Sequence, residues 1–249
     1  MFLLMDSLKI LREILTGRFH QKNSIGILMN LRKITSPLEG HPTPRMPWVK
    51  AATGSLGQGL SVGVGMAAAI RLAGLDRRVY VVMGDGECAE GSVWEAANSA
   101  ADLKLNRLTA IVDINRLGQS EPTMHGHDIE AFDRKFKAFG WNTVCIDGHD
   151  TEQILNAFDK ARASDLPMVI LCRTLKGKGV SFLEDKNGWH GKPLAGEDLQ
   201  KALAELGPMP DIDCKKYVKI PEAVKKPVWK NEFEFERKLY SDKTCLLYT

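Results

Sequence analysis

The sequence predicts an α/β fold in which a parallel sheet is flanked by helices on both faces. Four short apolar runs, at residues 79–83, 108–114, 143–146 and 168–171, have the length and β-branched content of buried strands. Segments with helical periodicity separate most of these runs, and strands that alternate with helices form right-handed βαβ units. The 249 residues, 44% hydrophobic and 26% charged, suffice to bury a sizeable core.

The helices are predicted in chain order from their periodicity and their ends. An alanine-rich helix precedes the first strand, and we expect its residues Gly63 and Gly65 to permit tight packing. A second helix opens at the capping-box pattern Ser92-Val93-Trp94-Glu95 and runs to about residue 104. Apolar spacing predicts two further helices, over residues 128–139 and 151–163.

The two ends of the chain differ from its middle. We expect the α/β domain to cover residues 28–207. Residues 1–27 form a separate segment in which leucines at helical spacing predict a short amphipathic helix. Residues 208–249, rich in Lys, Glu and Pro, are typical of a linker.

Charge, hydropathy and cysteine content exclude several classes of protein. A formal charge of +3 is too small for a nucleic-acid-binding surface, and no apolar run reaches the roughly 18–20 residues of a membrane span. The five cysteines are widely spaced and form no CxxC pair, so we expect reduced thiols in a cytoplasmic protein. Cys145 and Cys172 lie in apolar runs and are predicted to be core residues, as are Trp94 and Trp141. His125 and His127 have no third ligand nearby in the sequence, so we expect a loop there.

Polar residues follow the first two predicted strands. Asp85 lies between two glycines directly after the first strand, and Asn115 follows the second strand thirty residues later. Ligands of open parallel sheets bind at the carboxyl ends of the strands, so both side chains are expected at one edge. A carboxylate and an amide oxygen suit Mg²⁺ or Ca²⁺, with a backbone carbonyl, water and phosphate oxygens completing the coordination. Turns also favour Asp and Asn for structural reasons alone, so this prediction depends on the wider pattern.

A second pattern points to a different ligand. The segment Gly63-Val64-Gly65-Met66-Ala67-Ala68 matches the loose dinucleotide fingerprint, and Asp85 follows about twenty residues later. An NAD-dependent dehydrogenase would use these features. The fingerprint must open a helix directly after a strand, however, and the glycine-rich residues 55–60 make a poor strand.

Five blocks together resemble animal-type transketolase, a thiamine diphosphate enzyme. They occur in the family's order: Thr53-Gly54-Ser55-Leu56-Gly57-Gln58-Gly59-Leu60, Gly84-Asp85-Gly86-Glu87, Glu90-Gly91-Ser92-Val93-Trp94-Glu95-Ala96, Asp113-Ile114-Asn115-Arg116-Leu117-Gly118-Gln119-Ser120 and Trp189-His190-Gly191-Lys192-Pro193. The resemblance runs from about residue 28 to residue 206 and covers the diphosphate-binding domain alone.

The resemblance implies roles for particular residues. The metal would be held by the side chains of Asp85 and Asn115 and by the backbone carbonyl of Leu117. His41 and His190 would act on the substrate hydroxyls and the reacting carbons. The remaining implied cofactor contacts, which His190 and Asn115 share, are Gly54, Ser55, Leu56, Gly86, Glu87, Gln119 and Lys176.

The resemblance also implies an activity and its requirements. Transketolases transfer a two-carbon ketol unit from a ketose phosphate to an aldose phosphate, using thiamine diphosphate and Mg²⁺ or Ca²⁺, and they act as homodimers. The family's pyrimidine-binding domain carries the glutamate that activates the cofactor, and nothing in this sequence corresponds to it. We therefore expect the 249 residues alone to be inactive. The alternative is a non-catalytic module that binds the cofactor weakly, or only beside a chain that carries the missing domain.

Overall fold

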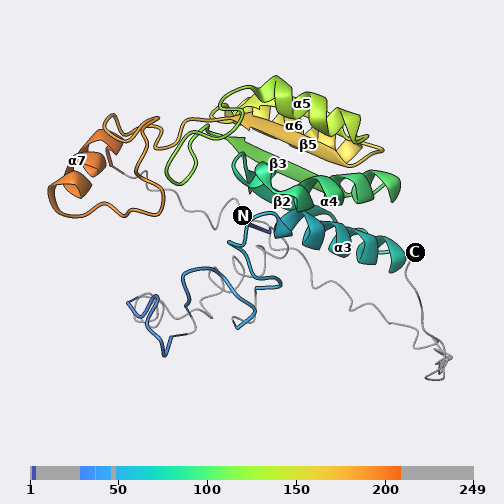
Figure 1. Ribbon diagram of the computed structural model, residues 1–249, viewed down its shortest axis with the longest axis horizontal. Coiled ribbons are helices and arrows are strands. Elements are labelled where there is room, and N and C mark those ends of the chain that lie inside the picture. Colours follow the sequence, from blue (N-terminus) through green and yellow to red (C-terminus); the bar gives the residue numbers. More distant parts are fainter. Residues whose placement is uncertain (1, 4–28, 37, 46–48, 209–249) are drawn as a thin grey trace.

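The computed structural model describes residues 2–3, 29–36, 38–45 and 49–208. Its centre is a five-stranded sheet with helices packed on both faces, as expected from the sequence (Figure 1). The strand order is β1-β2-β3-β5-β4. Among the described residues, no helix is long and apolar enough to span a bilayer.

The four longer strands are parallel and coincide closely with the predicted apolar runs. They are β2 (Val79–Gly84), β3 (Leu108–Ile114), β4 (Asn142–Asp147) and β5 (Met168–Arg173). The register pairs Gly84 with Asp113 and Ile114 with Arg173, so three strands end at nearly the same level. A two-residue strand, β1 (Phe2–Leu3), pairs antiparallel with β2 at the sheet's edge.

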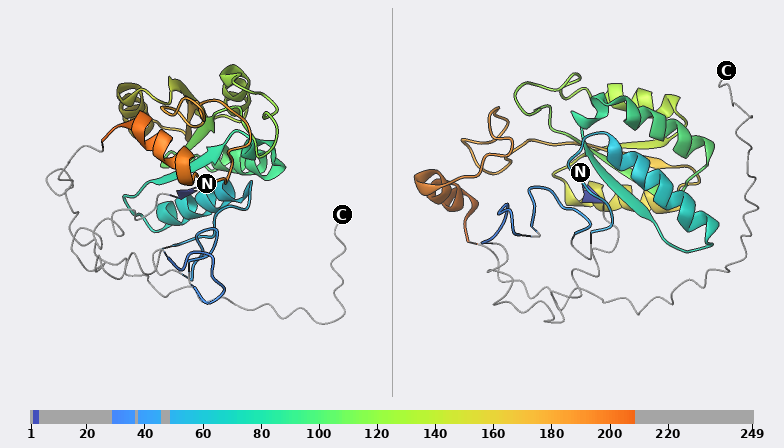
Figure 2. Two further views of the ribbon diagram at one scale, coloured as in Figure 1. Left: turned by 90° about the vertical axis from the view of Figure 1, so that its left-hand side faces the viewer. Right: turned by 60° about the horizontal axis from the view of Figure 1, so that its bottom comes forward.

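The predicted helices are present in the expected order. The helical elements are α3 (Gln58–Leu72), the 3-10 turn η1 (Glu87–Ala89), α4 (Gly91–Asp102), α5 (Ile129–Ala138), α6 (Thr151–Ala163) and α7 (Gly196–Leu206). Asp128 and Asp150 cap α5 and α6 through side-chain bonds to backbone N–H groups of the first turn. Beyond the carboxyl end of β5 the chain runs through a long loop into α7, which lies apart from the other helices (Figures 1 and 2).

Alternating side chains of the sheet supply two hydrophobic cores. On β5, Val169 and Leu171 join the large core formed with α3, α4 and α5. Ile170 and Cys172 point the other way and pack with Ala157 of α6. This alternation is the period-two pattern of a strand buried on both faces, and it confirms the predicted covering of the sheet.

The glycines of α3 differ in their surroundings. Gly63 is buried, and a Cβ built on it would lie 2.5 Å from Cγ2 of Val81, so its packing role is confirmed. Gly65 faces open space, with no atom within 4 Å of a built Cβ, so the packing role expected for it is wrong. Both glycines lie inside α3 rather than at a strand-to-helix turn, so the dinucleotide fingerprint lacks the geometry that phosphate binding requires.

Three further expectations are corrected. Ser92 does not cap α4, because the helix begins at Gly91 and the Ser92 hydroxyl instead donates to the carbonyl of Gly57 at 2.9 Å. Cys145 is exposed, because β4 is an edge strand, whereas Cys172 is buried as predicted. Trp94 is only partly buried at the margin of the large core. The helix expected near the N-terminus and nearly all of the predicted linker lie outside the described residues.

Candidate functional site

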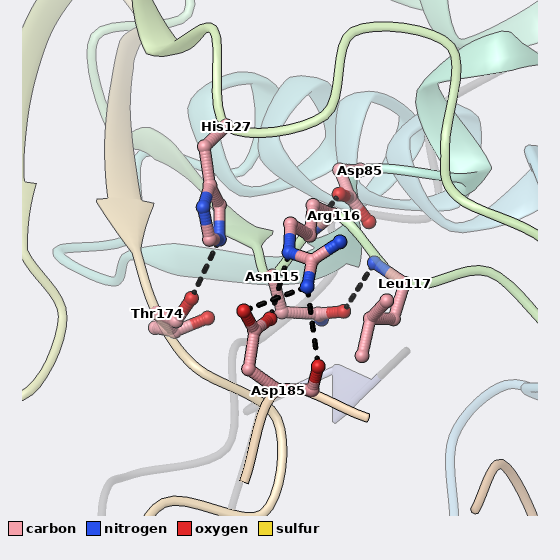
Figure 3. Close-up of polar contacts among 7 residues, drawn as sticks. All are labelled: Asp85, Asn115, Arg116, Leu117, His127, Thr174 and Asp185. Carbon is pink, nitrogen blue, oxygen red and sulfur yellow. Dashed lines mark hydrogen bonds and ion pairs between the residues drawn. The ribbon is translucent and has the colours of Figure 1, made fainter. Parts of the chain in front are cut away.

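The candidate site lies where β2, β3 and β5 end. Asp85 follows β2, the turn Asn115-Arg116-Leu117 follows β3, and the loop with Lys176 follows β5. Figure 3 shows Asp85, Asn115, Arg116 and Leu117 grouped at this edge, with Asp185 facing Arg116. The expected convergence of Asp85 and Asn115 follows directly from the parallel register.

Asp85 is buried, and its carboxylate accepts three hydrogen bonds. One oxygen accepts from the backbone N–H of Gly86 at 2.9 Å. The other accepts from the backbone N–H of Arg116 and from the hydroxyl of Thr123, each at 2.8 Å. A carboxylate offers about four lone-pair directions, so one stays available for a cation. The three bonds fix the side chain in place, as ligand-supporting bonds do in metal sites.

Asn115 is held in one orientation by its neighbours. Its amide nitrogen donates to Asp113 at 3.1 Å, and its amide oxygen accepts from the backbone N–H of Leu117 at 3.1 Å. Asp113 also accepts from the hydroxyl of Thr174, whose carbonyl contacts His127 Nε2 at 3.0 Å. The network therefore directs the amide oxygen of Asn115 toward the turn that carries Leu117.

The carbonyl of Leu117 already attracts a cation. Lys176 Nζ donates to it at 2.9 Å, and the same Nζ lies 3.4 Å from Nδ1 of His190. Two residues that the sequence placed near the diphosphate thus meet the third predicted metal ligand. They do so from a loop about sixty residues further along the chain.

The glycine-rich loop before α3 is tied to the turn after β2. Glu87 is only 3% exposed, and its carboxylate accepts from the backbone N–H of Gly57 at 3.0 Å. The hydroxyl of Ser92 bonds the carbonyl of the same glycine, so Gly57 is fixed on both sides. Gly57 has a φ of 81°, and a Cβ there would lie 2.5 Å from the Ser92 oxygen, so the turn requires glycine.

His41 lies directly against Gly54. Gly54 has a φ of 96°, and a Cβ built on it would overlap the His41 ring. Two predicted site residues from different blocks are therefore in contact. Ser55, Leu56 and Gln119 are exposed along the same loops, where a ligand can reach them.

The oxygen donors around the Asn115-Arg116-Leu117 turn fit a hard divalent cation. They comprise one carboxylate, one amide and one carbonyl, the donor set that Mg²⁺ and Ca²⁺ accept. The described part of the chain holds no cluster of three or more His, Cys, Asp or Glu side chains suited to a metal. A metal at this edge would therefore depend on the amide and carbonyl oxygens as well as on Asp85.

Sequence reasoning missed three residues that shape this site. Thr123 bonds Asp85, and Arg116 pairs with Asp185 at 2.7 Å. Thr123 lies in a turn with no periodic pattern, and Asp185 is 69 residues beyond Arg116. Only Arg116 carried a signal, since it stands between two predicted metal ligands.

Comparison with known proteins identifies this architecture. The family model described as "Transketolase, thiamine diphosphate binding domain" matches residues 13–242. Mouse transketolase is 46% identical over 182 residues, a region that covers 72% of this chain and 29% of the mouse protein. One component of the apulose-4-phosphate transketolase from Phocaeicola vulgatus is 40% identical over 177 residues, which cover 71% of this chain and 63% of that component.

Solved structures agree with the sequence comparisons. The transketolase structure from Campylobacter jejuni superposes with a TM-score of 0.66 at 33% identity, covering 76% of this chain and 31% of that one. The Pichia stipitis transketolase complex with sedoheptulose-7-phosphate gives 0.64 at 28% identity, covering 73% and 29%. The chain thus spans less than a third of the mouse protein and of these two solved chains.

Proposed function

The chain belongs to the transketolase family through its thiamine diphosphate-binding domain, and on that premise we propose that it supplies the diphosphate and metal site of a ketol transferase. The reaction would move a two-carbon ketol unit from a ketose phosphate to an aldose phosphate. Pichia stipitis structures are described as complexes with xylulose-5-phosphate and sedoheptulose-7-phosphate, which supports sugar phosphates as the substrate class.

One observation carries the proposal. The carboxylate of Asp85, the amide of Asn115 and the carbonyl of Leu117 converge on one turn and are oriented by hydrogen bonds. Asp85 and Asn115 would hold Mg²⁺ or Ca²⁺ by side chain and Leu117 by its carbonyl, and the metal would fix the diphosphate. Thiamine diphosphate, once bound, supplies the carbon that attacks the ketose carbonyl.

The other predicted residues would bind and orient the ligands. Lys176 brings a positive charge to the diphosphate, and His190 lies beside it. His41, packed on Gly54, is placed to accept or donate a proton at a sugar hydroxyl, a task that suits imidazole near neutral pH. Glu87 and Gly86 form the wall next to Asp85, and Ser55, Leu56 and Gln119 complete the proposed cofactor surface.

Thermal denaturation tests the cofactor site. Thiamine diphosphate with Mg²⁺ at one hundred times its Kd should stabilise the chain by about 2.7 kcal/mol, and EDTA should remove the gain. Asp85→Asn should abolish the increment, because the amide cannot replace the charged ligand. Asp133→Asn is the matched control, since Asp133 also accepts side-chain hydrogen bonds but lies on α5, away from the site. An equal increment in Asp85→Asn would refute the site, and a comparable increment with NAD would favour a dehydrogenase.

A second candidate is a module that functions only with a partner chain. The relative from Phocaeicola vulgatus is named as one component of a transketolase with more than one kind of chain, which supports division of this activity between chains. We predict no ketol transfer by the purified 249 residues alone, assayed with xylulose-5-phosphate and an aldose phosphate. Transfer by the isolated chain would contradict this prediction, whereas activity only with an added chain carrying the missing domain would support it.

The proposal extends to assembly and location. We propose a homodimer when the full set of family domains is present, and a cytoplasmic protein. Support for the location comes from the three described cysteines, which are all free thiols. Analytical ultracentrifugation of the chain with and without cofactor tests the assembly.

A further inference from the structure

We propose that Arg116 and Asp185 are positioning residues whose ion pair holds the loop carrying Lys176 and His190 against the metal-site turn. The role of that loop in binding diphosphate rests on the proposed function. The clamp itself is a property of the unliganded chain, and it can be measured there.

The pair has the geometry of a specific, two-point contact. Arg116 Nε donates to one carboxylate oxygen of Asp185 at 2.8 Å, and Nη2 donates to the other at 2.7 Å. Nη2 also donates to the backbone carbonyl of Asp185 at 3.1 Å (Figure 3). Bidentate pairing fixes direction as well as distance, which a lysine could not do.

Arg116 is part of the metal-site turn on its other side. Its backbone N–H donates to Asp85 at 2.8 Å, and its chain neighbours Asn115 and Leu117 are the other two proposed ligands. Its φ is 62°, a left-handed conformation that is uncommon for arginine. Such backbone conformations persist where surrounding contacts impose them, and they cluster at functional sites.

Asp185 connects the pair to Lys176. Its backbone N–H donates to the carbonyl of Lys176 at 2.9 Å, so residues 176–185 form a closed loop. Gly177, at a φ of 74°, lies close enough to Leu183 that a Cβ would come within 3.0 Å of its backbone. Asp185 itself has a φ of 56°. Pinning Asp185 to Arg116 therefore places Lys176 where its ammonium reaches the carbonyl of Leu117.

The charges agree with this arrangement. The hydrogen bond from Arg116 holds the pKa of Asp185 below its ordinary value, and the positive charges of His127 and Arg173 act in the same direction. The carboxylate is therefore ionised at neutral pH. Both side chains are 33% exposed, and ion pairs this exposed add little to overall stability. The effect of the pair should accordingly be local to the loop.

Hydrogen exchange followed by mass spectrometry measures the clamp without any ligand. Arg116→Ala and Asp185→Asn should each speed amide exchange in residues 176–190 by about tenfold, with peptides from β3 and β5 unchanged. The double variant should add little to either single change, because both remove the same contact. Arg116→Lys should restore part of the protection, since it keeps the charge and loses the fork. Arg134→Ala, which removes an exposed ion pair to Glu130 on α5, is the matched control and should leave the loop unchanged.

Cofactor affinity separates this proposal from the proposed function. The Kd for thiamine diphosphate with Mg²⁺, measured by calorimetry, should rise by about tenfold in both clamp variants and stay constant in Arg134→Ala. Unchanged loop exchange, exchange that accelerates throughout the sheet, or an unchanged Kd beside a loosened loop would each overturn the clamp. A wild-type chain that binds no cofactor while its loop shows the expected exchange would overturn the proposed function and support the clamp.

Discussion

Two glycines of α3 should respond to the same substitution in opposite directions. A Cβ at Gly63 would meet Val81 Cγ2 at 2.5 Å and Leu108 Cδ1 at 3.4 Å. Both partners are fully buried side chains of the sheet, so they have little room to move. Gly65, two positions further along the helix, meets no atom within 4 Å.

The expected free energies follow from these contacts. Alanine raises helix propensity at either position by up to about 1 kcal/mol. Gly65→Ala should therefore stabilise the chain. Gly63→Ala carries in addition an overpacking cost of about 1–3 kcal/mol. Because the propensity term is common to both, the two variants should differ by about 1–3 kcal/mol, with Gly63→Ala the less stable.

Urea denaturation followed by circular dichroism measures this difference. The midpoint should fall for Gly63→Ala and rise for Gly65→Ala with a constant slope, and a melting curve should separate the variants by about 2–4 °C for each kcal/mol. Equal stability of the two variants would show that α3 does not pack on β2 as described. Neither change should reduce the increment from thiamine diphosphate, since neither glycine lies at the proposed site.

Three further outcomes are expected. The bond from the backbone N–H of Gln153 lowers the pKa of Asp150 from its ordinary value of 3.8. The cap's contribution is thus present above that value and lost as pH falls through the lower folded pKa. The stability advantage of wild type over Asp150→Asn should therefore disappear in an acid titration, and an advantage constant with pH would argue against it. In peptide-resolved alkylation at pH 8, Cys145 should react before Cys172, because Cys145 is exposed whereas burial raises the pKa of Cys172 to about 12; faster labelling of Cys172 would contradict the edge position of β4. Asp128→Ala should destabilise the chain by about 1 kcal/mol in urea melts through loss of the α5 cap, and an unchanged midpoint would show that the cap contributes nothing.

The sheet and the first two metal-ligand candidates were predictable because they depend on local periodicity and on one general rule. Buried parallel strands are continuous apolar runs, and all four were found within two residues of their observed ends. Once β2 and β3 are adjacent and parallel, Asp85 and Asn115 must lie at the same edge. The resemblance to transketolase extended this prediction to loops that carry no periodicity of their own.

Details that depend on exact packing were predicted less well. The capping pattern at Ser92 is satisfied in the sequence, yet the hydroxyl bonds Gly57, which is 35 residues away. Gly63 and Gly65 look equivalent in the sequence and differ only in which side of α3 faces β2. An apolar strand residue such as Cys145 is exposed because β4 forms the edge of the sheet, and strand order is not encoded locally.

The sequence alone therefore determined the α/β class, the strand ends that bear polar residues, and the family. Tertiary structure decided how those residues are held: three donors on Asp85, His41 against Gly54, and the pairing of Arg116 with Asp185. The physical reason is range. Periodicity and register act between neighbours in the chain or in the sheet, whereas the bonds that orient the site join loops whose paths are fixed only when the domain has packed.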